Sequence, residues 1–352
     1  MKNAVAVIGQ GFVGGSLTTV LSERGVKPYV CDKAGKVAQG GIDLMRPIPA
    51  VAIVSAVWNA NGHPGDILNR RAVDADHSIA RFVSLVEQQP DFTGIYFVCV
   101  PTPMRPDGSC DLSIVDGVLT ELASAPRDDG VTRIAVIKST VPPGSTAAWN
   151  DKFGKYGPDS DLHVIFCPEF LTEANALDDM RNQDRIILGG PRPWINRVKQ
   201  LFERAFPKVP IHKTSSTTAE MVKYVTNIHL AVKVSLANEF YQICNALDAN
   251  GLDLDYDKVV EYATIDARLG ISHWKVPGPM PADDTGEPAL GFAGSCFIKD
   301  INALMKQAEQ LGIDPKVMRG AWEKNLEVRP QRDWEKLVGR AVSISKEESD
   351  DI

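Results

Sequence analysis

A glycine-rich turn near the N-terminus constrains the fold more than any other part of this sequence. Gly9, Gly11 and Gly14 form the pattern Gly-x-Gly-x-x-Gly. Residues 3–9 run apolar without polar alternation, as in a buried parallel strand, and residues 12–24 have the pattern of a helix. A strand, a glycine turn and a helix in this order indicate the first half of a strand–helix–strand unit in an α/β sheet.

The same turn predicts a dinucleotide site. The first glycine permits the tight turn, the second lets the backbone approach a pyrophosphate, and the third allows close packing of helix and strand. Phe12 and Val13 then open the helix, whose N-terminus attracts phosphate. A second predicted strand, residues 27–31, ends at Asp32, where a carboxylate accepts hydrogen bonds from ribose hydroxyls and repels a 2′-phosphate. We therefore expect NAD rather than NADP. The alternative is a glycine-rich turn that binds nothing.

The rest of the chain predicts a Rossmann-like doubly wound parallel sheet followed by a helical central domain. Residues 217–249 contain no Pro or Gly and predict one long helix. This helix differs from the alternating short strands and helices of the first domain. We expect an NAD-binding domain over 1–205, a central domain over 206–330, and a partly disordered C-terminal tail over 331–352. The shorter predicted segments are strands at 94–100, 133–138, 163–167 and 185–188, helices at 300–311 and 315–328, and a loop at 277–294.

Composition and charge narrow the class of protein. The net charge of −7 argues against a nucleic-acid partner. The six cysteines include no Cys-x-x-Cys pair and no secreted disulfide pattern, so we expect no metal site and a reducing cytoplasm. No apolar run has the length of a membrane helix, and the glycine turn stands where a signal peptide would need its apolar core.

Several polar segments are candidates for a catalytic site, because some of them directly follow predicted strands. Cys296 follows a glycine-rich loop and precedes Lys299 and Asp300, a setting that favours a thiolate; the alternative is a buried packing residue. Lys223 and Asn227 are spaced to share a helix face and could hold an oxyanion, or form a solvated face.

The segment Pro168 to Glu173 predicts a helix start. Glu169 and Glu173 would share a face of that helix, with Pro168 in its first turn. Two acids there also suit the helix dipole, which is the competing structural explanation. Thr140 lies at a predicted strand end before two prolines, and its alternative is a simple turn residue.

These motifs together resemble the UDP-glucose and GDP-mannose 6-dehydrogenase family. The resemblance covers residue 3 to about 328, and order and spacing agree. The matching motifs are GQGFVG, VPTP, DGSCDLS, KSTVPPG, PEFLTE, the helix with Lys223 and Asn227, and GSCFIKD.

The resemblance implies an enzyme that oxidises the primary alcohol of a nucleotide sugar, such as UDP-glucose, to a carboxylate with two NAD. It implies that Cys296 forms a thiohemiacetal and then a thioester. It also implies a homodimer, or a multiple of one, that pairs through the 217–249 helix. The remaining implied roles are oxyanion stabilisation by Lys223 and Asn227, water activation by Asp300 and Thr140, thioester hydrolysis by Glu169, and cofactor contacts by Pro101, Thr102, Thr140, Glu173 and Lys299.

The sequence also departs from the family pattern. Residues 46–66 do not match, the loop 276–290 is longer than usual, and Ala293 and Ile298 replace a usual Gly and Pro. We further expect the second α/β domain, which holds the nucleotide in family members, to be absent. Two other functions stay open: a dehydrogenase that performs a single two-electron oxidation, as hydroxy-acid dehydrogenases do, and a non-catalytic dinucleotide-binding module.

Overall fold

The computed structural model describes residues 2–45, 78–126, 132–154, 162–278 and 289–343. The chain forms two compact units. Unit 1 is Met1–Val100 with Ser113–Glu220, and unit 2 is Pro101–Leu112 with Met221–Ile352. All of the stretch 46–66, which departs from the family pattern, and residues 279–288 of the long loop before Cys296 lie outside the described residues.

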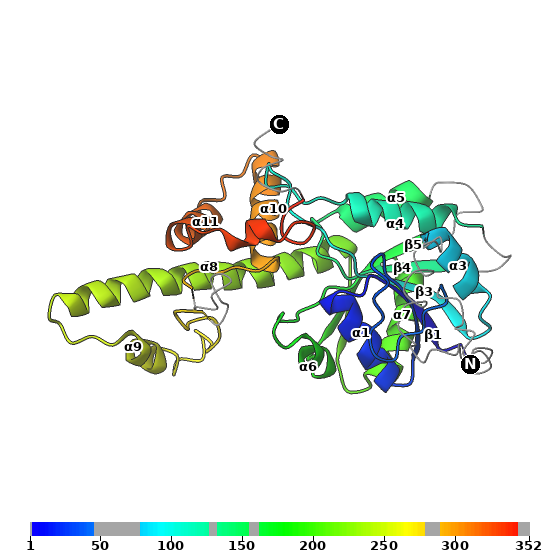
Figure 1. The fold of residues 1–352 in the computed structure, drawn as a ribbon, viewed down its shortest axis with the longest axis horizontal. Coiled ribbons are helices and arrows are strands. Elements are labelled where there is room, and N and C mark those ends of the chain that lie inside the picture. Colours follow the sequence, from blue (N-terminus) through cyan, green and yellow to red (C-terminus); the bar gives the residue numbers. More distant parts are fainter. Residues whose placement is uncertain (1, 46–77, 127–131, 155–161, 279–288, 344–352) are drawn as a thin grey trace, which may run out of the picture. The chain divides into compact units, whose positions relative to one another are not determined.

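Unit 1 alternates strands and helices along the chain, as the sequence predicts (Figure 1). The elements are β1 (Ala4–Ile8), α1 (Phe12–Glu23), β2 (Lys27–Cys31), α3 (Ile79–Glu87), β3 (Phe92–Val98), α4 (Ser113–Ser124), β4 (Arg133–Ile137), α5 (Ser145–Gly154), β5 (Leu162–Phe166), α6 (Ala176–Arg181), β6 (Ile186–Gly189), α7 (Arg192–Ala205), β7 (Ile211–Thr214) and the first turn of α8 (Ser216–Ala249).

The described part of unit 1 contains one 7-stranded sheet in the order β2-β1-β3-β4-β5-β6-β7. Every neighbouring pair is parallel except β5 and β6, which are antiparallel. Across the sheet, β2 lies on one side of β1, and β3 and all later strands lie on the other side. The order therefore reverses beside β1, and such a reversal point is where α/β sheets bind ligands.

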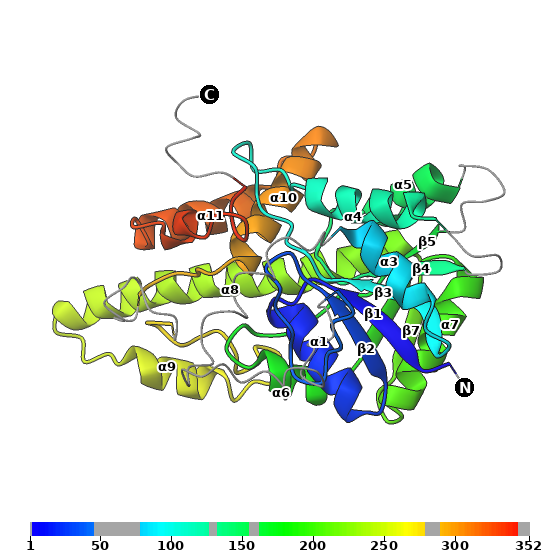
Figure 2. The ribbon, with the colours of Figure 1, turned by 45° about the vertical axis from the view of Figure 1, so that its right-hand side comes forward.

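Helices cover both faces of the sheet, which confirms the doubly wound fold. Val5 and Val7 of β1 share one core with Leu17 and Val20 of α1 and with Val198 of α7. The helices α3, α4 and α5 lie on the other side of the sheet from α1 (Figure 2). Neighbouring strand residues point to opposite faces, and every residue of β1 and β4 is buried, so both faces of these strands are covered. This explains why the strands of the sheet are apolar with little polar alternation.

Some predicted boundaries were wrong by one or two residues, and one strand was missed. The third strand ends at Val98 rather than at residue 100. The missed strand, β7, has the sequence Ile-His-Lys-Thr and lies at the sheet edge with its two central side chains exposed. It carries no apolar run, so the sequence gives no strand signal there.

Unit 2 is helical apart from isolated bridges in its described part. The predicted long helix is confirmed as α8, which Figure 1 shows as one unbroken helix. Tyr224 and Ile228 of α8 share a core with Ile298 and Ile301. The other helices of unit 2 are α9 (Tyr256–Ala263), α10 (Cys296–Gln310), α11 (Lys316–Val328) and the short 3-10 helix η1 (Asp333–Lys336).

The start of the predicted C-terminal tail packs within unit 2. Trp334 and Ala341 are buried and join the core formed by α8 and α10. The Arg329 guanidinium, fully buried at the end of α11, forms an ion pair with Asp333. Residues 344–352 lie outside the described part of the chain.

Candidate active site

The glycine turn has the geometry that its sequence predicts. Gly9 adopts a φ of +88°, in the region that favours glycine, and a Cβ there would lie 2.7 Å from the Cys99 carbonyl oxygen. A Cβ on Gly14 would lie 1.9 Å from the Gly9 oxygen, so only glycine lets α1 approach β1 this closely. A Cβ on Gly11 would meet nothing within 4 Å. The space beside Gly11 and the start of α1 at Phe12 fit a pyrophosphate.

Asp32 follows β2 and orders the glycine turn. Its Oδ2 accepts a hydrogen bond from the Gln10 N–H at 2.8 Å, and its Oδ1 accepts from the N–H groups of Ala34 and Lys36. A carboxylate oxygen can accept two bonds, so Oδ2 keeps capacity for a ribose hydroxyl. The residues around the turn therefore fit NAD.

Three residues form a row at the carboxyl edge of the sheet. Cys99, Lys138 and Cys167 directly follow β3, β4 and β5, and the strand ends Val98, Ile137 and Phe166 are in register. The N–H of Lys138 donates to the Val98 carbonyl and that of Cys167 to the Ile137 carbonyl. This row brings the two loops that carry Thr140 and Glu169 to neighbouring positions on one sheet edge.

Glu169 and Glu173 do not lie on a helix, which corrects the sequence prediction. Residues 167–172 are irregular, Glu173 is an exposed turn residue, and α6 begins only at Ala176. Glu169 is buried, and its carboxylate accepts a hydrogen bond from the Leu171 N–H at 2.7 Å. The carboxylate thus closes a local turn instead of starting a helix. Thr140 is also buried.

A buried acid outside the predicted set holds the loop that follows Thr140. Glu220, in the first turn of α8, accepts hydrogen bonds from the N–H groups of Gly144 and Thr146 at 2.6 and 2.8 Å. Burial raises the pKa of Glu220 although these bonds oppose the rise. Because 76 residues separate Glu220 from Gly144, no local motif indicates this pairing.

In unit 2, Cys296 is the first residue of α10, four positions earlier than the predicted helix start. Ser295 is the N-cap, and Gly294 before it adopts a φ of +72°. The N-terminus of a helix carries a partial positive charge, which favours the thiolate form of a cysteine there. The half-buried Cys296 therefore has the surroundings of a nucleophile.

Asp300, one turn further along α10, joins two of the predicted site residues. The Asn227 amide donates a hydrogen bond to Oδ2 of Asp300 at 2.6 Å, and the Lys299 ammonium pairs with Oδ1 at 2.5 Å. Asp300 is 1% exposed. Lys223, one turn before Asn227 on α8, is also buried.

Lys299 is a cation that interacts electrostatically with the candidate nucleophile, Cys296. Burial alone would lower the pKa of Lys299, but the Asp300 carboxylate and the thiols of Cys296 and Cys110 outweigh it and raise the pKa. The ammonium therefore stays charged and attracts a thiolate at Cys296. Cys110, for which the sequence predicts no role, shares this environment.

Most other cysteines have the character of packing residues. Burial raises the pKa of Cys31 and of Cys99 to about 12 and that of Cys110 to about 11. In the loop of Cys110, Thr102 is buried and Pro101 is exposed. Both belong to unit 2, whereas the glycine turn belongs to unit 1.

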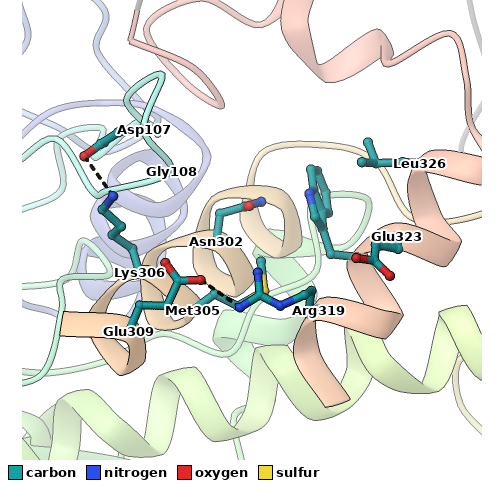
Figure 3. A pocket seen from close by; sticks show the side chains of 10 residues that line it. Asp107, Gly108, Asn302, Met305, Lys306, Glu309, Arg319, Glu323 and Leu326 are labelled. Carbon is teal, nitrogen blue, oxygen red and sulfur yellow. Dashed lines mark hydrogen bonds and ion pairs between the residues drawn. The ribbon is translucent and has the colours of Figure 1, made fainter. Parts of the chain in front are cut away.

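Unit 2 also contains a surface hollow of about 360 Å³, lined by none of the predicted site residues. Figure 3 shows two pairs of charged side chains in its wall, Lys306 with Asp107 and Arg319 with Glu309, whose charged atoms lie 3.7 and 2.9 Å apart. Trp322 of α11 forms part of its wall. Since most of its charges are already paired, the hollow does not compete with the Cys296 region as a catalytic centre.

Comparison with known proteins agrees with this geometry. Residues 70–206 match the NAD-binding domain of the UDP-glucose/GDP-mannose dehydrogenase family, and residues 217–327 match its central domain. The UDP-glucose 6-dehydrogenase AglM of Haloferax volcanii is 30% identical over 340 residues, which cover 93% of this chain and 70% of that protein. The chain belongs to the UDP-glucose/GDP-mannose dehydrogenase family. Its N-terminal unit is accordingly an NAD-binding domain of this family.

Other members and solved structures extend the comparison. The UDP-glucose 6-dehydrogenase TuaD of Bacillus subtilis is 28% identical, and the match covers 91% of this dehydrogenase-family chain but 62% of TuaD. A UDP-glucose dehydrogenase structure from Pyrobaculum islandicum has a TM-score of 0.67 at 26% identity, and the match covers 93% of this chain and 68% of the Pyrobaculum chain.

The fold is shared more widely than the family. The 3-hydroxyisobutyrate dehydrogenase of Mycobacterium tuberculosis has a TM-score of 0.60 at 17% identity, with 94% of this chain and 95% of that one covered. This likeness shows the fold alone. None of the helices that the structure describes combines the length and the apolar character of a membrane span.

Proposed function

We propose that this protein oxidises the primary alcohol of a nucleotide sugar, of the UDP-glucose type, to a carboxylate. The observation that carries the proposal is Cys296 at the first position of α10 with the Lys299 ammonium close to it. A dehydrogenase that stops after one two-electron oxidation needs no cysteine nucleophile, so this arrangement favours the four-electron reaction.

The proposed reaction balances as one alcohol, two NAD⁺ and one water giving one carboxylate, two NADH and three protons. NAD, when bound, accepts the hydride that each oxidation removes from the substrate carbon. The first oxidation yields an aldehyde. The Cys296 thiolate then adds to the aldehyde carbon and forms a C–S bond, and the second oxidation turns this thiohemiacetal into a thioester. Water adds to the thioester carbon, the C–S bond breaks, and Cys296 leaves as the thiolate.

The other predicted residues have roles that their chemistry supports. Lys223 and Asn227 stabilise the oxyanions of the alkoxide and the thiohemiacetal. Asp300, held between Asn227 and Lys299, positions or activates water, and Thr140 has the same proposed role. Glu169 assists the hydrolysis of the thioester. The proposed contacts to NAD come from Gly9, Gly11, Phe12, Val13, Gly14, Asp32, Pro101, Thr102, Thr140, Glu173 and Lys299.

We also propose a homodimer formed through α8. Leu236, Phe240, Ile243 and Leu247 recur every three or four residues, so they share one helix face, and all four are more than a third exposed. A contiguous apolar stripe of this kind is typical of an interface with another chain.

The test of the proposed function is Cys296→Ala. Removal of the nucleophile abolishes carboxylate formation but preserves NAD affinity and the melting temperature. Loss of a packing cysteine would instead cost about 1–3 kcal/mol of stability and leave the protein active. NADH formation should be screened across nucleotide sugars with the parent and the variant. A ratio of one NADH per substrate, with aldehyde accumulating, would reject the four-electron reaction.

A further inference from the structure

Lys138 is a buried cation for which the proposed function has no use. It directly follows β4 and is 5% exposed. Ile134 and Val136 precede it on the strand and belong to the core that faces α1 and α7, and strand alternation places Lys138 on the same face. Lysine is almost never buried to this degree without a specific partner, because a desolvated ammonium is costly.

The partners of Lys138 lie on the neighbouring strand end. Its Nζ donates a hydrogen bond to the Pro168 carbonyl oxygen at 2.9 Å and contacts the Cys167 Sγ at 3.5 Å. The Pro168 carbonyl belongs to the peptide group whose nitrogen is that of Glu169. Because the proline ring fixes φ of Pro168, only ψ remains to orient this peptide. A charge-assisted bond to the carbonyl sets that ψ.

The Glu169 side chain is also held by the turn that follows it in the sequence. Its Oε2 accepts the Leu171 N–H at 2.7 Å, and the residue is 6% exposed. The peptide before Glu169 and the turn after it therefore both determine where the carboxylate points. Of the two, the preceding peptide depends on a residue of another strand, Lys138.

We propose that Lys138 is a positioning residue that orients the Glu169 carboxylate through the Pro168 carbonyl, and that thioester hydrolysis depends on it. The proposal rests on the proposed function, which assigns this hydrolysis to Glu169. Lys138 touches neither thioester nor water in this account. Its loss therefore slows the step that Glu169 assists and leaves the two oxidations intact.

The experiment uses Lys138→Met, which keeps the length of the side chain but removes the donor. A rapid-mixing assay should show an initial NADH burst like that of the parent, followed by turnover slowed by about 10- to 100-fold, since small misplacements of a catalytic group have effects of this size. Intact-mass measurement after acid quench should find the acyl group on Cys296. Lys138→Arg, which keeps a cationic donor, restores part of the rate. Cys167→Ala removes only the sulfur contact and keeps the parent rate.

A double-mutant cycle distinguishes positioning of Glu169 by Lys138 from a loss of rate that has nothing to do with Glu169. If Lys138 acts through Glu169, Lys138→Met with Glu169→Gln is no slower than Glu169→Gln alone. The proposal would be overturned if the rate losses of the two single variants multiplied in the double variant, or if Lys138→Met hydrolysed the thioester at the parent rate. If the parent makes no carboxylate, the proposed function fails instead. A crystal structure of Lys138→Met then still decides the positioning: a Glu169 carboxylate in its original place refutes it, and a displaced one supports it.

Discussion

The amide of Asn227 and the carboxylate of Asp300 form a 2.6 Å hydrogen bond across 73 residues of sequence. The Lys299 ammonium occupies the other carboxylate oxygen. The negative charge of Asp300 thus holds the buried Asn227 amide and the partly buried Lys299 ammonium in fixed positions.

Asp300→Asn should reduce carboxylate production by about 100-fold or more, because it removes the proposed acid–base group and leaves Lys299 without its counter-ion. Steady-state kinetics measure the change. Asn302→Ala is the matched control, since the Asn302 amide donates to the Ile298 carbonyl of its own helix. An Asp300→Asn enzyme with parental kcat would contradict the role.

Asp32→Ser should narrow the preference for NAD over NADP by about tenfold or more, equivalent to about 1.4 kcal/mol. The reason is that the variant removes the charge that repels a 2′-phosphate. The ratio of kcat/KM with the two cofactors measures it. A parent enzyme that uses both cofactors equally would show that Asp32 does not select between them.

Glu87→Ala should destabilise unit 1 by about 3–5 kcal/mol, because the buried Arg133 would lose its charge partner. Both side chains are 4% exposed and form a bidentate pair at 2.7 and 2.8 Å. Urea unfolding gives the value. Glu87→Gln, which keeps the shape and some hydrogen bonding, should lose less; equal losses would mean that the charge is not the cause.

His273 should make the protein less stable in acid. Burial, with help from the Lys233 ammonium, lowers the pKa of His273 below its ordinary value of 6.5. The unfolded chain therefore binds a proton near pH 6.5 that the folded chain resists. The contribution of neutral His273 to stability is full above pH 6.5 and is lost as the pH falls toward the folded pKa.

The variant His273→Asn tests this effect, since asparagine tolerates the positive φ of 67° at this position. Urea midpoints at pH 7.5 and 5.5 should fall further for the parent than for the variant. Parallel losses in both proteins would exclude His273 as the source.

Ile243→Asp should convert the proposed dimer to a monomer, because it places a charge within the apolar stripe of α8. Light scattering at micromolar concentration measures the mass. Val317→Asp changes an equally apolar residue that is 73% exposed on α11 and should leave the mass unchanged. A parent protein that is monomeric under these conditions would refute the dimer.

The sequence predicted the elements whose signals are local. The first strand, α1 and the second strand follow from apolar runs around three glycines, and α8 follows from 33 residues without Pro or Gly. The helix predicted at Pro168 failed because Pro168 and Glu169 instead hold a turn through Leu171 and Lys138. Contacts of that kind depend on strands that come together only in the folded chain.

The candidate site shows the same division. A motif identified Cys296, Lys299 and Asp300, since they are neighbours in the sequence. The link from Asp300 to Asn227 required α8 and α10 to pack, and the burial of Lys138 required three strands in register. Sequence motifs therefore named most candidate residues but not what orients them.

The hydrogen bonds of Glu220 have a consequence for anion selectivity. Its carboxylate occupies the N–H groups at the start of α5, which otherwise would offer a phosphate the same positive end that α1 offers. The chain thus carries its own anion at α5 and leaves the start of α1, beside the open space at Gly11, to an external one. Of these two helix starts, that of α5 is bonded to the Glu220 carboxylate and that of α1 has no side-chain cap, so the α1 terminus is the one suited to the pyrophosphate of a dinucleotide.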